Sequence, residues 1–356
     1  MSDSKSIRIG IIGAGGIAQH QVKYLKQIPW VELAGVADIV PAKARESARA
    51  WGIPEANVFE DYRDLVERVE LDAVSVCTFN QAHRGPAVDA LAAGKHVLLE
   101  KPMAATLEDA RAIMRAWEHS GKILMVGFQP DFSGDQMAAK QIADSGLLGS
   151  IYYAEAVAHR RWGVPGGSFV KKAAAGAGAL VDIGVYALHA ALRLMGNPRP
   201  VTVSAATTNC LIKGYRGATV KSWGGSWRPE DVEVEELATA YIRFESGAVM
   251  VFKTSWASNV DSMGRTFVMG TKGGLALDPL EVYVNQQVGD LNMTLTPRNV
   301  PKVDEWTGKM TAFAEAVRDN RPSPIDPREA YLTNVIMDGV MRSAALGEEV
   351  KVDSAY

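Results

Sequence analysis

The chain has 356 residues, of which 47% are hydrophobic and 22% charged, and its formal net charge is −3. This length and composition predict about two globular domains with a substantial core. The pI near 6.1 argues against nucleic acids and anionic membranes as partners, because both select basic patches. We expect neither a signal peptide nor an apolar run long enough to cross a membrane, and we therefore predict a cytoplasmic protein.

The first third of the chain alternates apolar segments with segments of helical period. IRIGIIG, VELAGVAD and LDAVSVCT (7–13, 31–38 and 71–78) are continuous apolar runs, as in buried parallel strands. Between the first two runs, IAQHQVKYLKQI (17–28) has the period of an amphipathic helix. This alternation predicts βαβ units and an α/β fold with a doubly wound, Rossmann-type parallel sheet.

The first predicted strand ends in GAGGIA, which has the pattern G-x-G-x-x-A at Gly13, Gly15 and Ala18. In a dinucleotide-binding turn, the first glycine permits the tight turn and the second lets the backbone approach a pyrophosphate. The small third residue allows close helix packing, and the helix start offers N–H groups to phosphate. We therefore predict that Gly13, Gly15, Gly16, Ile17 and Ala18 bind a dinucleotide; a glycine turn without a ligand is the alternative.

Asp38 follows Ala18 by twenty residues, at the end of the second predicted strand. An acidic residue at this distance binds the ribose hydroxyls of a dinucleotide. Its charge would repel the 2′-phosphate of NADP, so the sequence favours NAD as the cofactor. Lys43 and Arg45 follow closely and keep NADP open as the alternative.

A later strand, HVLLE (96–100), brings Glu100 and Lys101 to the sheet edge where doubly wound folds bind ligands. A lysine beside a nicotinamide can bond a carbinol oxygen and lower its pKa as hydride leaves. The other interpretation is a solvated surface lysine that pairs with Glu100.

The sequence resembles the Gfo/Idh/MocA oxidoreductase family in its glycine motif and in the Glu100–Lys101 pair followed by proline. It also resembles that family in four further segments: CTFNQAH (77–83), GALVDIGVYALHAALRLMG (178–196), VEELATAYIRFESGAVM (234–250) and FAEAVRDNRPSPIDPREA (313–330). That family includes glucose–fructose oxidoreductase and inositol dehydrogenases. The resemblance implies that Glu100 binds a cofactor ribose and that Lys101 takes part in proton transfer. It also implies that Thr78, Asn80 and His83 bind the cofactor, the last two near the nicotinamide. Phe79 replaces the family's usual proline, and His83 has a second interpretation as a residue that packs at a helix start.

The second half contains strand-like segments without a regular helix after each one: IYYAEAVAHR, PVTVSAATTN, ATAYIRF, AVMVFKTSW and RTFVMGT (151–160, 200–209, 238–244, 248–256 and 265–271). Their period-two alternation predicts an α+β domain on a large, mostly antiparallel sheet with one open face. We place the Rossmann domain at 1–127 and a substrate-binding and oligomerisation domain at 128–356. The resemblance implies a homodimer or homotetramer formed through the open face. It also implies that the carboxyl-terminal helices (307–319 and 327–347) pack back on the first domain.

Asp182, Tyr186 and His189 are spaced to share one face of an α-helix. The resemblance places this helix over the nicotinamide, with Tyr186 at the family's usual histidine position and His189 at a usual aspartate position. A free phenol has a pKa near 10, so we expect Lys101 to favour its ionised form. Our hypothesis is that Tyr186 and Lys101 share proton transfer, while Asp182 positions a substrate hydroxyl. His189 either relays the proton, orients Tyr186 or is simply packed in the core.

The segment HRRWGVPGGSFVKK (159–172) combines charged groups with an aromatic face, as sugar-binding sites do. We predict that Arg161, Trp162 and Lys172 contact the substrate together with Asp182 and Tyr186. A basic surface loop with a packed tryptophan is the alternative. Trp223 and Trp227 offer a second stacking surface.

These observations predict an NAD(H)-dependent oxidoreductase acting on a secondary hydroxyl or ketone of a sugar, glycoside or cyclic polyol, without a metal. One alternative is a sugar oxidoreductase or redox-assisted glycosidase that recycles tightly bound NAD(H). Another is a ligand-sensing regulator of the same fold, although such a sensor would not need Lys101, Asp182 and Tyr186.

Overall fold

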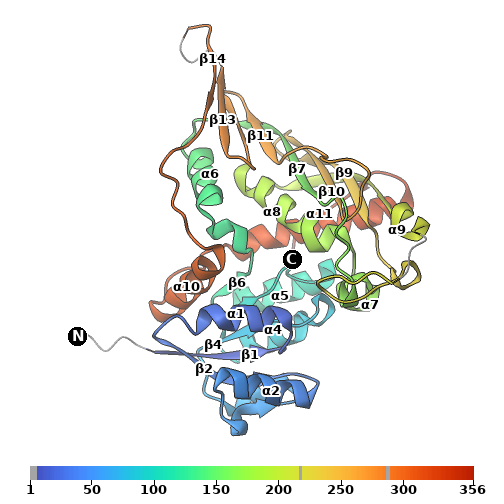
Figure 1. Cartoon of the computed structure of the whole chain (residues 1–356). Helices are drawn as coiled ribbons and strands as arrows, with labels where there is room; N and C mark the ends of the chain where they lie inside the picture. Colours follow the sequence, from blue (N-terminus) through green and yellow to red (C-terminus); the bar gives the residue numbers. More distant parts are fainter. Residues whose placement is uncertain (1–5, 216–218, 286–288) are drawn as a thin grey trace. The chain divides into compact units, whose positions relative to one another are not determined.

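The computed structural model describes residues 6–215, 219–285 and 289–356, and its chain forms two compact units (Figure 1). The first unit comprises Met1–Phe132, Val303–Tyr331 and Tyr356, and the second comprises Ser133–Lys302 and Leu332–Ala355. The structure therefore ends the first segment at residue 132 rather than 127. It also assigns 303–331 to the first unit and most of the remaining tail to the second.

The first unit contains a six-stranded parallel sheet in the order β3-β2-β1-β4-β5-β6. The strands are β1 (Ile7–Ile12), β2 (Val31–Ala37), β3 (Val58–Phe59), β4 (Ala73–Val76), β5 (His96–Leu99) and β6 (Leu124–Val126). Its helices are α1 (Gly16–Leu25), α2 (Pro41–Trp51), α3 (Tyr62–Arg68), α4 (Arg84–Ala92), α5 (Leu107–Ser120) and α10 (Glu305–Arg318), with short 3₁₀ turns η1 (Glu55–Asn57), η2 (Asn80–Ala82) and η3 (Gln129–Phe132). The predicted Rossmann architecture is confirmed.

The burial of β1 explains its apolar sequence. Five of its six residues are buried, because helices cover both faces of a parallel sheet. The strand order reverses between β1 and β4: the strands that follow β1 in the chain lie on one side of it, and those that follow β4 lie on the opposite side of the sheet. Ligands of doubly wound folds bind at such a switch point, outside the carboxyl ends of the strands. The residues after Ile12, Val76 and Leu99 therefore share the ligand-binding edge.

The second unit contains a nine-stranded sheet in the order β14-β13-β12-β11-β7-β10-β9-β8-β15. The strands are β7 (Ile151–His159), β8 (Pro200–Thr208), β9 (Leu237–Phe244), β10 (Val249–Ser255), β11 (Phe267–Gly270), β12 (Gly273–Ala276), β13 (Glu281–Asn285), β14 (Asn292–Leu295) and β15 (Val350–Lys351). All pairings are antiparallel except that of β7 with β10. The predicted, mostly antiparallel sheet is confirmed.

Helices cover one face of this sheet, and Figure 1 shows α8 alongside the central strands. Strand β9 alternates between buried residues and half-buried or exposed ones, which is the pattern of a sheet with one covered and one open face. The other elements are α6 (Gly134–Asp144), η4 (Gly167–Val170), α7 (Lys172–Ala175), η5 (Leu180–Gly184), α8 (Val185–Leu194), α9 (Cys210–Gly214), η6 (Pro229–Asp231) and α11 (Pro327–Leu346), which begins in the first unit.

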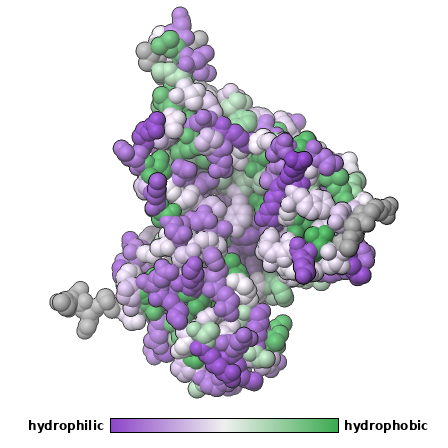
Figure 2. Space-filling model, in the orientation of Figure 1, coloured by the Kyte–Doolittle hydropathy of each residue, from purple (hydrophilic) through white to green (hydrophobic). Residues whose placement is uncertain are grey.

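One stretch corrects the expectation about membrane-length segments. Lys172–Leu194 is long and apolar enough to cross a bilayer, but 89% of its most apolar window is buried in the protein. Such burial is typical of a core helix, since a membrane span would expose its apolar side chains to lipid. On the face drawn in Figure 2, hydrophobic residues form small groups among hydrophilic ones.

Candidate active site

The loop after β1 has the geometry that a dinucleotide needs. Gly13 has a φ of +90°, and a Cβ atom there would lie 2.8 Å from the backbone oxygen of Cys77. A Cβ on Gly15 would meet only the Lys43 ammonium at 3.9 Å, and one on Gly16 would meet nothing within 4 Å. Gly13 thus packs tightly against the end of β4, while the backbone after it is open to a phosphate. Ile17 is half-buried and Ala18 is fully buried at the start of α1, as the motif requires.

Asp38 is held after the end of β2 by two backbone hydrogen bonds. Its Oδ2 accepts a hydrogen bond of 2.7 Å from Ala14 N, and its Oδ1 accepts one of 2.9 Å from Val40 N. The ammonium of Lys43 lies 3.8 Å from Oδ2. The carboxylate thereby links the glycine loop to the start of α2.

The segment after β4 is fixed by a buried histidine. His83 is fully buried, with Nδ1 2.9 Å from Pro102 O and Nε2 3.3 Å from Thr78 O. Burial lowers the pKa of His83, although the nearby carbonyls oppose this effect. Asn80 opens the turn η2 between these contacts. His83 therefore connects the backbone at Thr78 with the backbone directly after Lys101. These contacts agree with the interpretation of His83 as a residue that packs at a helix start.

Glu100 lies at the centre of a buried polar network. Its Oε1 accepts hydrogen bonds from Gln21 Nε2 at 2.5 Å and from Lys309 Nζ at 2.9 Å, and its Oε2 accepts one of 3.3 Å from Lys101 N. Gln21 in turn accepts a bond of 2.6 Å from Ser75 Oγ. Glu100 is 5% exposed, so the structure places it beneath the site surface, with half-buried Lys101 next to it.

Gln21 and Lys309 are the residues of this network that sequence reasoning missed. Gln21 is buried on α1. The helical period of the sequence placed it on the apolar face, but this was only weak evidence for burial because glutamine is usually exposed. Lys309 is fully buried on α10 and has no local motif. Cys77, directly after β4, is also buried, and burial raises the pKa of its thiol to about 12, which keeps it neutral.

In the second unit, Asp182 lies in a π-helix. The five-residue segment η5 (Leu180–Gly184) precedes α8, so Asp182 does not continue the α-helical stacking predicted for it with Tyr186 and His189. Tyr186 is half-buried, whereas His189 is 1% exposed. Single π-helical turns often occur at functional sites, because they redirect one side chain out of the regular helical register.

The carboxylate of Asp182 is fixed from two sides. Its Oδ2 accepts hydrogen bonds of 2.9 Å from Trp256 Nε1 and 3.1 Å from Arg160 Nη1. Asp182 is 6% exposed and its bond with Trp256 is buried, whereas the Arg160 side chain is partly exposed. Charge-assisted bonds of this kind hold an anion in place for a ligand.

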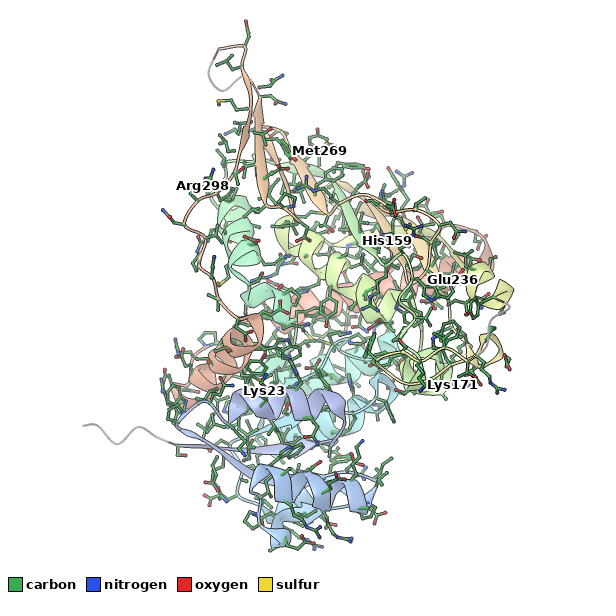
Figure 3. All side chains as sticks on the ribbon, viewed as in Figure 1. Lys23, His159, Lys171, Glu236, Met269 and Arg298 are labelled. Atoms are coloured by element: carbon green, nitrogen blue, oxygen red, sulfur yellow. The ribbon has the colours of Figure 1, made fainter. Side chains whose placement is uncertain are left out.

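Arg160, rather than the neighbouring Arg161, binds Asp182. Arg161 pairs with Asp261 at 2.6 Å, and both of these side chains are exposed. Trp162 is 49% exposed on the same loop, whose two ends are marked by His159 and Lys171 in Figure 3. Sequence alone could not tell the adjacent arginines apart, because their directions depend on the pairing of this loop with Ser255 and Trp256.

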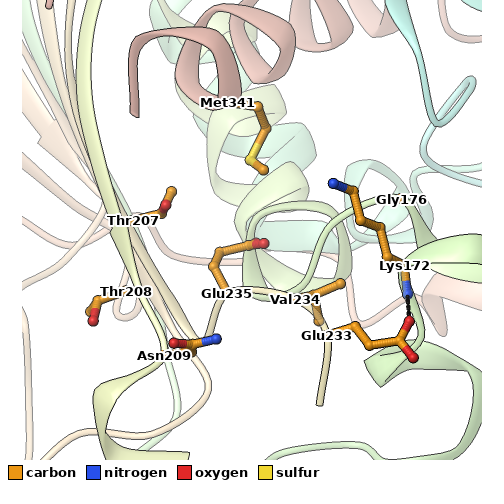
Figure 4. Close-up of a pocket in the computed structure, with 9 residues that line it drawn as sticks. All are labelled: Lys172, Gly176, Thr207, Thr208, Asn209, Glu233, Val234, Glu235 and Met341. Atoms are coloured by element: carbon orange, nitrogen blue, oxygen red, sulfur yellow. Dashed lines mark hydrogen bonds between the residues drawn. The ribbon is translucent and has the colours of Figure 1, made fainter. Parts of the chain in front are cut away.

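Lys172 lines a pocket of about 230 Å³ in the second unit (Figure 4). Its backbone N–H donates a 2.9 Å hydrogen bond to Glu233, and its side chain extends away from this contact. The pocket is further lined by Gly176, Thr207, Thr208, Asn209, Val234, Glu235 and Met341.

Glu235 connects this pocket to the segment that carries Asp182. Its carboxylate accepts hydrogen bonds from Gly178 N at 2.8 Å and Leu180 N at 3.1 Å. Burial raises the pKa of Glu235, and the N–H groups partly oppose this effect. Glu235 therefore fixes the start of η5, two residues before Asp182.

Among the residues that the structure describes, no group of three histidine, cysteine or acidic side chains could hold a metal ion.

Comparison with known proteins identifies the family. Residues 7–128 match the model of the oxidoreductase family with an NAD-binding Rossmann fold, and residues 137–276 match the GFO/IDH/MocA C-terminal domain. The chain belongs to the Gfo/Idh/MocA oxidoreductase family. The predicted family, oxidoreductase class and NAD cofactor are thus confirmed for this Gfo/Idh/MocA oxidoreductase.

Similar proteins cover nearly the whole Gfo/Idh/MocA chain. D-glucoside 3-dehydrogenase of Escherichia coli (strain K12) is 33% identical over 356 residues, or 98% of both chains. The structure of aldose-aldose oxidoreductase from Caulobacter crescentus, complexed with glycerol, is 25% identical with a TM-score of 0.78, covering 98% of this chain and all of that one. Levoglucosan dehydrogenase in complex with NADH and L-sorbose has the same fold, with 22% identity and a TM-score of 0.80 over 98% of this chain and 99% of that one.

Proposed function

We propose that this oxidoreductase transfers hydride between NAD and a secondary carbinol of a sugar, a cyclic polyol or, most specifically, a glycoside. The similarity to D-glucoside 3-dehydrogenase carries this proposal, because it extends over 98% of both chains and therefore includes the substrate-binding half. The buried Asp182 supports the proposal. Two hydrogen bonds fix its carboxylate, and a fixed carboxylate can accept a further hydrogen bond from a sugar hydroxyl.

The proposed chemistry needs a hydride acceptor and a group that takes the hydroxyl proton. NAD, when bound by the Gly13–Ala18 loop and Asp38, supplies the hydride acceptor. We assign proton transfer to Lys101 and Tyr186, and we assign the orientation of the substrate hydroxyl to Asp182. Lys101 follows β5 at the ligand-binding edge of the first sheet, where His83 and Glu100 fix the surrounding backbone. These fixed positions favour a preorganised site.

A direct assay tests the reaction. The protein is incubated with NAD or NADP and with methyl glucosides, free aldoses and inositols, and NADH formation is followed at 340 nm. We expect turnover with NAD and a glucoside. Absence of reduction with every compound would contradict the proposal and favour a sensor. Nucleotide released from the denatured protein would identify a tightly bound, recycled cofactor.

A variant tests the role of Tyr186. Tyr186→Phe removes only the phenolic hydroxyl, and we expect kcat to fall about 10²- to 10⁴-fold because proton transfer is lost. Tyr152→Phe, on an exposed tyrosine of β7, is the matched control. Near wild-type turnover by Tyr186→Phe would remove this residue from the mechanism.

We also propose that copies associate through the open face of the nine-stranded sheet. Tyr153, Tyr241, Val249 and Val251 are only half-buried on its central strands, and a partner would cover these apolar groups. Light scattering on the purified protein tests this proposal, and a monomer at micromolar concentration would contradict it.

We propose that the enzyme works in the cytoplasm, where thiols stay reduced. Cys77 and Cys210 are both free in the structure. Cell fractionation tests this location.

A further inference from the structure

Two loops of the second unit form an aromatic surface, which we define as Trp162, Phe169, Tyr215 and Trp223. The Trp162 ring lies 5.5 Å from the Tyr215 ring, and the Phe169 ring lies 4.7 Å from the Trp223 ring in an edge-to-face contact. Trp162 is 49% exposed and Trp223 is 63% exposed. Highly exposed tryptophans are uncommon, and the loop that carries Trp162 also carries Arg160, which bonds Asp182.

Glycines hold the two loops together. A Cβ atom on Gly166 would lie 2.2 Å from Gly225 O, and one on Gly167 would lie 1.9 Å from Gly224 O. Gly224 N donates a hydrogen bond of 3.0 Å to Pro165 O. The backbones are therefore in direct contact, which fixes the loop that carries Trp223 against the loop that carries Trp162 and Phe169.

A buried tryptophan supports the surface from below. Trp227 is 1% exposed, its ring lies 6.2 Å from that of Trp162, and its backbone pairs with Val220. It shares a hydrophobic cluster with Ile183 and Trp256. The aromatic surface therefore lies next to a buried hydrophobic cluster, against which Phe169 also packs.

The same loop reaches the site carboxylate. Trp162 lies between Arg160, which bonds Asp182 at 3.1 Å, and Gly163, whose oxygen accepts a 3.1 Å bond from the same guanidinium. Gly163 N also donates to Trp256 O at 2.8 Å, and Trp256 Nε1 donates to Asp182. One hydrogen-bonded unit therefore positions both Asp182 and the backbone of Trp162.

We propose that the aromatic surface binds the aglycone ring of a glycoside substrate, either a second pyranose or an aryl group. The apolar faces of such rings stack on indoles, and the exposed charged side chains of Arg161, Lys171 and Arg228 on the same two loops can bond hydroxyl groups. This inference rests on the proposed function, with the reacting sugar bound at Asp182 and the aglycone bound at the tryptophans.

The test compares substrates that differ only in the aglycone. The kcat/KM values of methyl and phenyl glucosides of the same anomeric configuration, and of a glucose disaccharide, are measured for the wild type, Trp162→Ala and Trp223→Ala. We expect the wild type to prefer the larger substrates, and we expect each variant to lower the ratio of phenyl to methyl glucoside about tenfold. Tyr152→Ala removes an equally exposed aromatic ring elsewhere in the second unit and should leave the ratio unchanged.

Each result has a definite meaning. An unchanged ratio in both tryptophan variants, with active enzyme, would overturn the aglycone site and leave the proposed function intact. If no glucoside is oxidised, the assignment of a glycoside as the substrate fails, and quenching of tryptophan fluorescence by phenyl glucoside then decides the inference. Quenching that Trp223→Ala weakens would support the aromatic surface as a sugar-aglycone site, and its absence in the wild type would overturn it.

Discussion

The ammonium of Lys309 lies 2.9 Å from Oε1 of Glu100, although 209 residues separate them in the sequence. Lys309 is fully buried and also lies 4.1 Å from the centre of the Trp306 ring. Burial raises the pKa of Glu100, but the Lys309 charge and hydrogen bond outweigh this effect, so the pKa lies below its usual value. The pair therefore fixes α10 to the end of β5, next to Lys101.

Replacing Lys309 tests how far this pair supports the site. Lys309→Met leaves the Glu100 carboxylate buried without its cation, and we expect a loss of about 3–5 kcal/mol in the free energy of unfolding. Because the folded pKa of Glu100 is lowered, its stabilising contribution is present above the ordinary value of 4.5 and is lost as the pH falls below it. Urea unfolding of wild type and variant between pH 3 and 7 measures both effects.

The double variant Glu100→Gln with Lys309→Met is the control. It removes both charges, and we expect it to recover part of the lost stability because no uncompensated ion stays buried. Equal stability of Lys309→Met and the wild type at neutral pH would show that the pair contributes little.

The parts of the molecule that depend on local sequence were predictable. The Gly13–Ala18 motif, the apolar runs of the parallel strands and the period-two strands of the second unit depend on neighbouring residues, and the structure agrees with them. Turn geometry and burial of one or both sheet faces leave such patterns in any chain.

The contacts that orient the site could not be predicted in this way. The bond from Lys309 to Glu100 and the bond from Trp256 to Asp182 join residues distant in sequence. The choice of Arg160 over Arg161 depends on one loop pairing with β10, and the π-helix at Asp182 interrupts an otherwise regular helical pattern. These features follow from tertiary packing, which overrides local preference.

Asp38 should determine the choice of cofactor. Asp38→Ser removes the carboxylate that accepts a hydrogen bond from Ala14 N and that we predict to bind the cofactor ribose, so we expect kcat/KM for NAD to fall about 10- to 100-fold. NADP should lose less or gain, because the repulsion of its 2′-phosphate disappears. Steady-state kinetics with both cofactors measure the ratio, and Glu32→Ser at the other end of β2 is the control. An unchanged ratio would contradict the role of Asp38.

Glu235 should act on turnover through Asp182. Glu235→Gln keeps one acceptor oxygen but turns an N–H donor toward the Gly178 and Leu180 amides, which shifts the start of η5. We expect kcat to fall about tenfold or more, since small displacements of a positioning group are costly. The raised pKa of Glu235 means that the folded state loses stability as the pH rises above 4.5, and the variant should show a flatter pH dependence.

Glu236 offers a matched control for this prediction. It is also buried and accepts two backbone hydrogen bonds, but from Leu211 and Ile212 in α9. Glu236→Gln should therefore affect stability and leave kcat within about twofold of the wild type. If the two variants change kcat equally, Glu235 has no special connection with Asp182.

Gly167 should be intolerant of any side chain. Gly167→Ala places a Cβ atom 1.9 Å from Gly224 O at a φ of +57°, so the loops that carry Trp162 and Trp223 must separate. Gly196→Ala has a similar φ of +77° but meets nothing within 4 Å, and it therefore isolates the backbone strain from the collision. We expect Gly167→Ala to be less stable than Gly196→Ala by about 1–3 kcal/mol and to change the near-UV circular dichroism of the tryptophans. Equal stability and unchanged spectra would show that the two loops are held together by contacts other than their glycines.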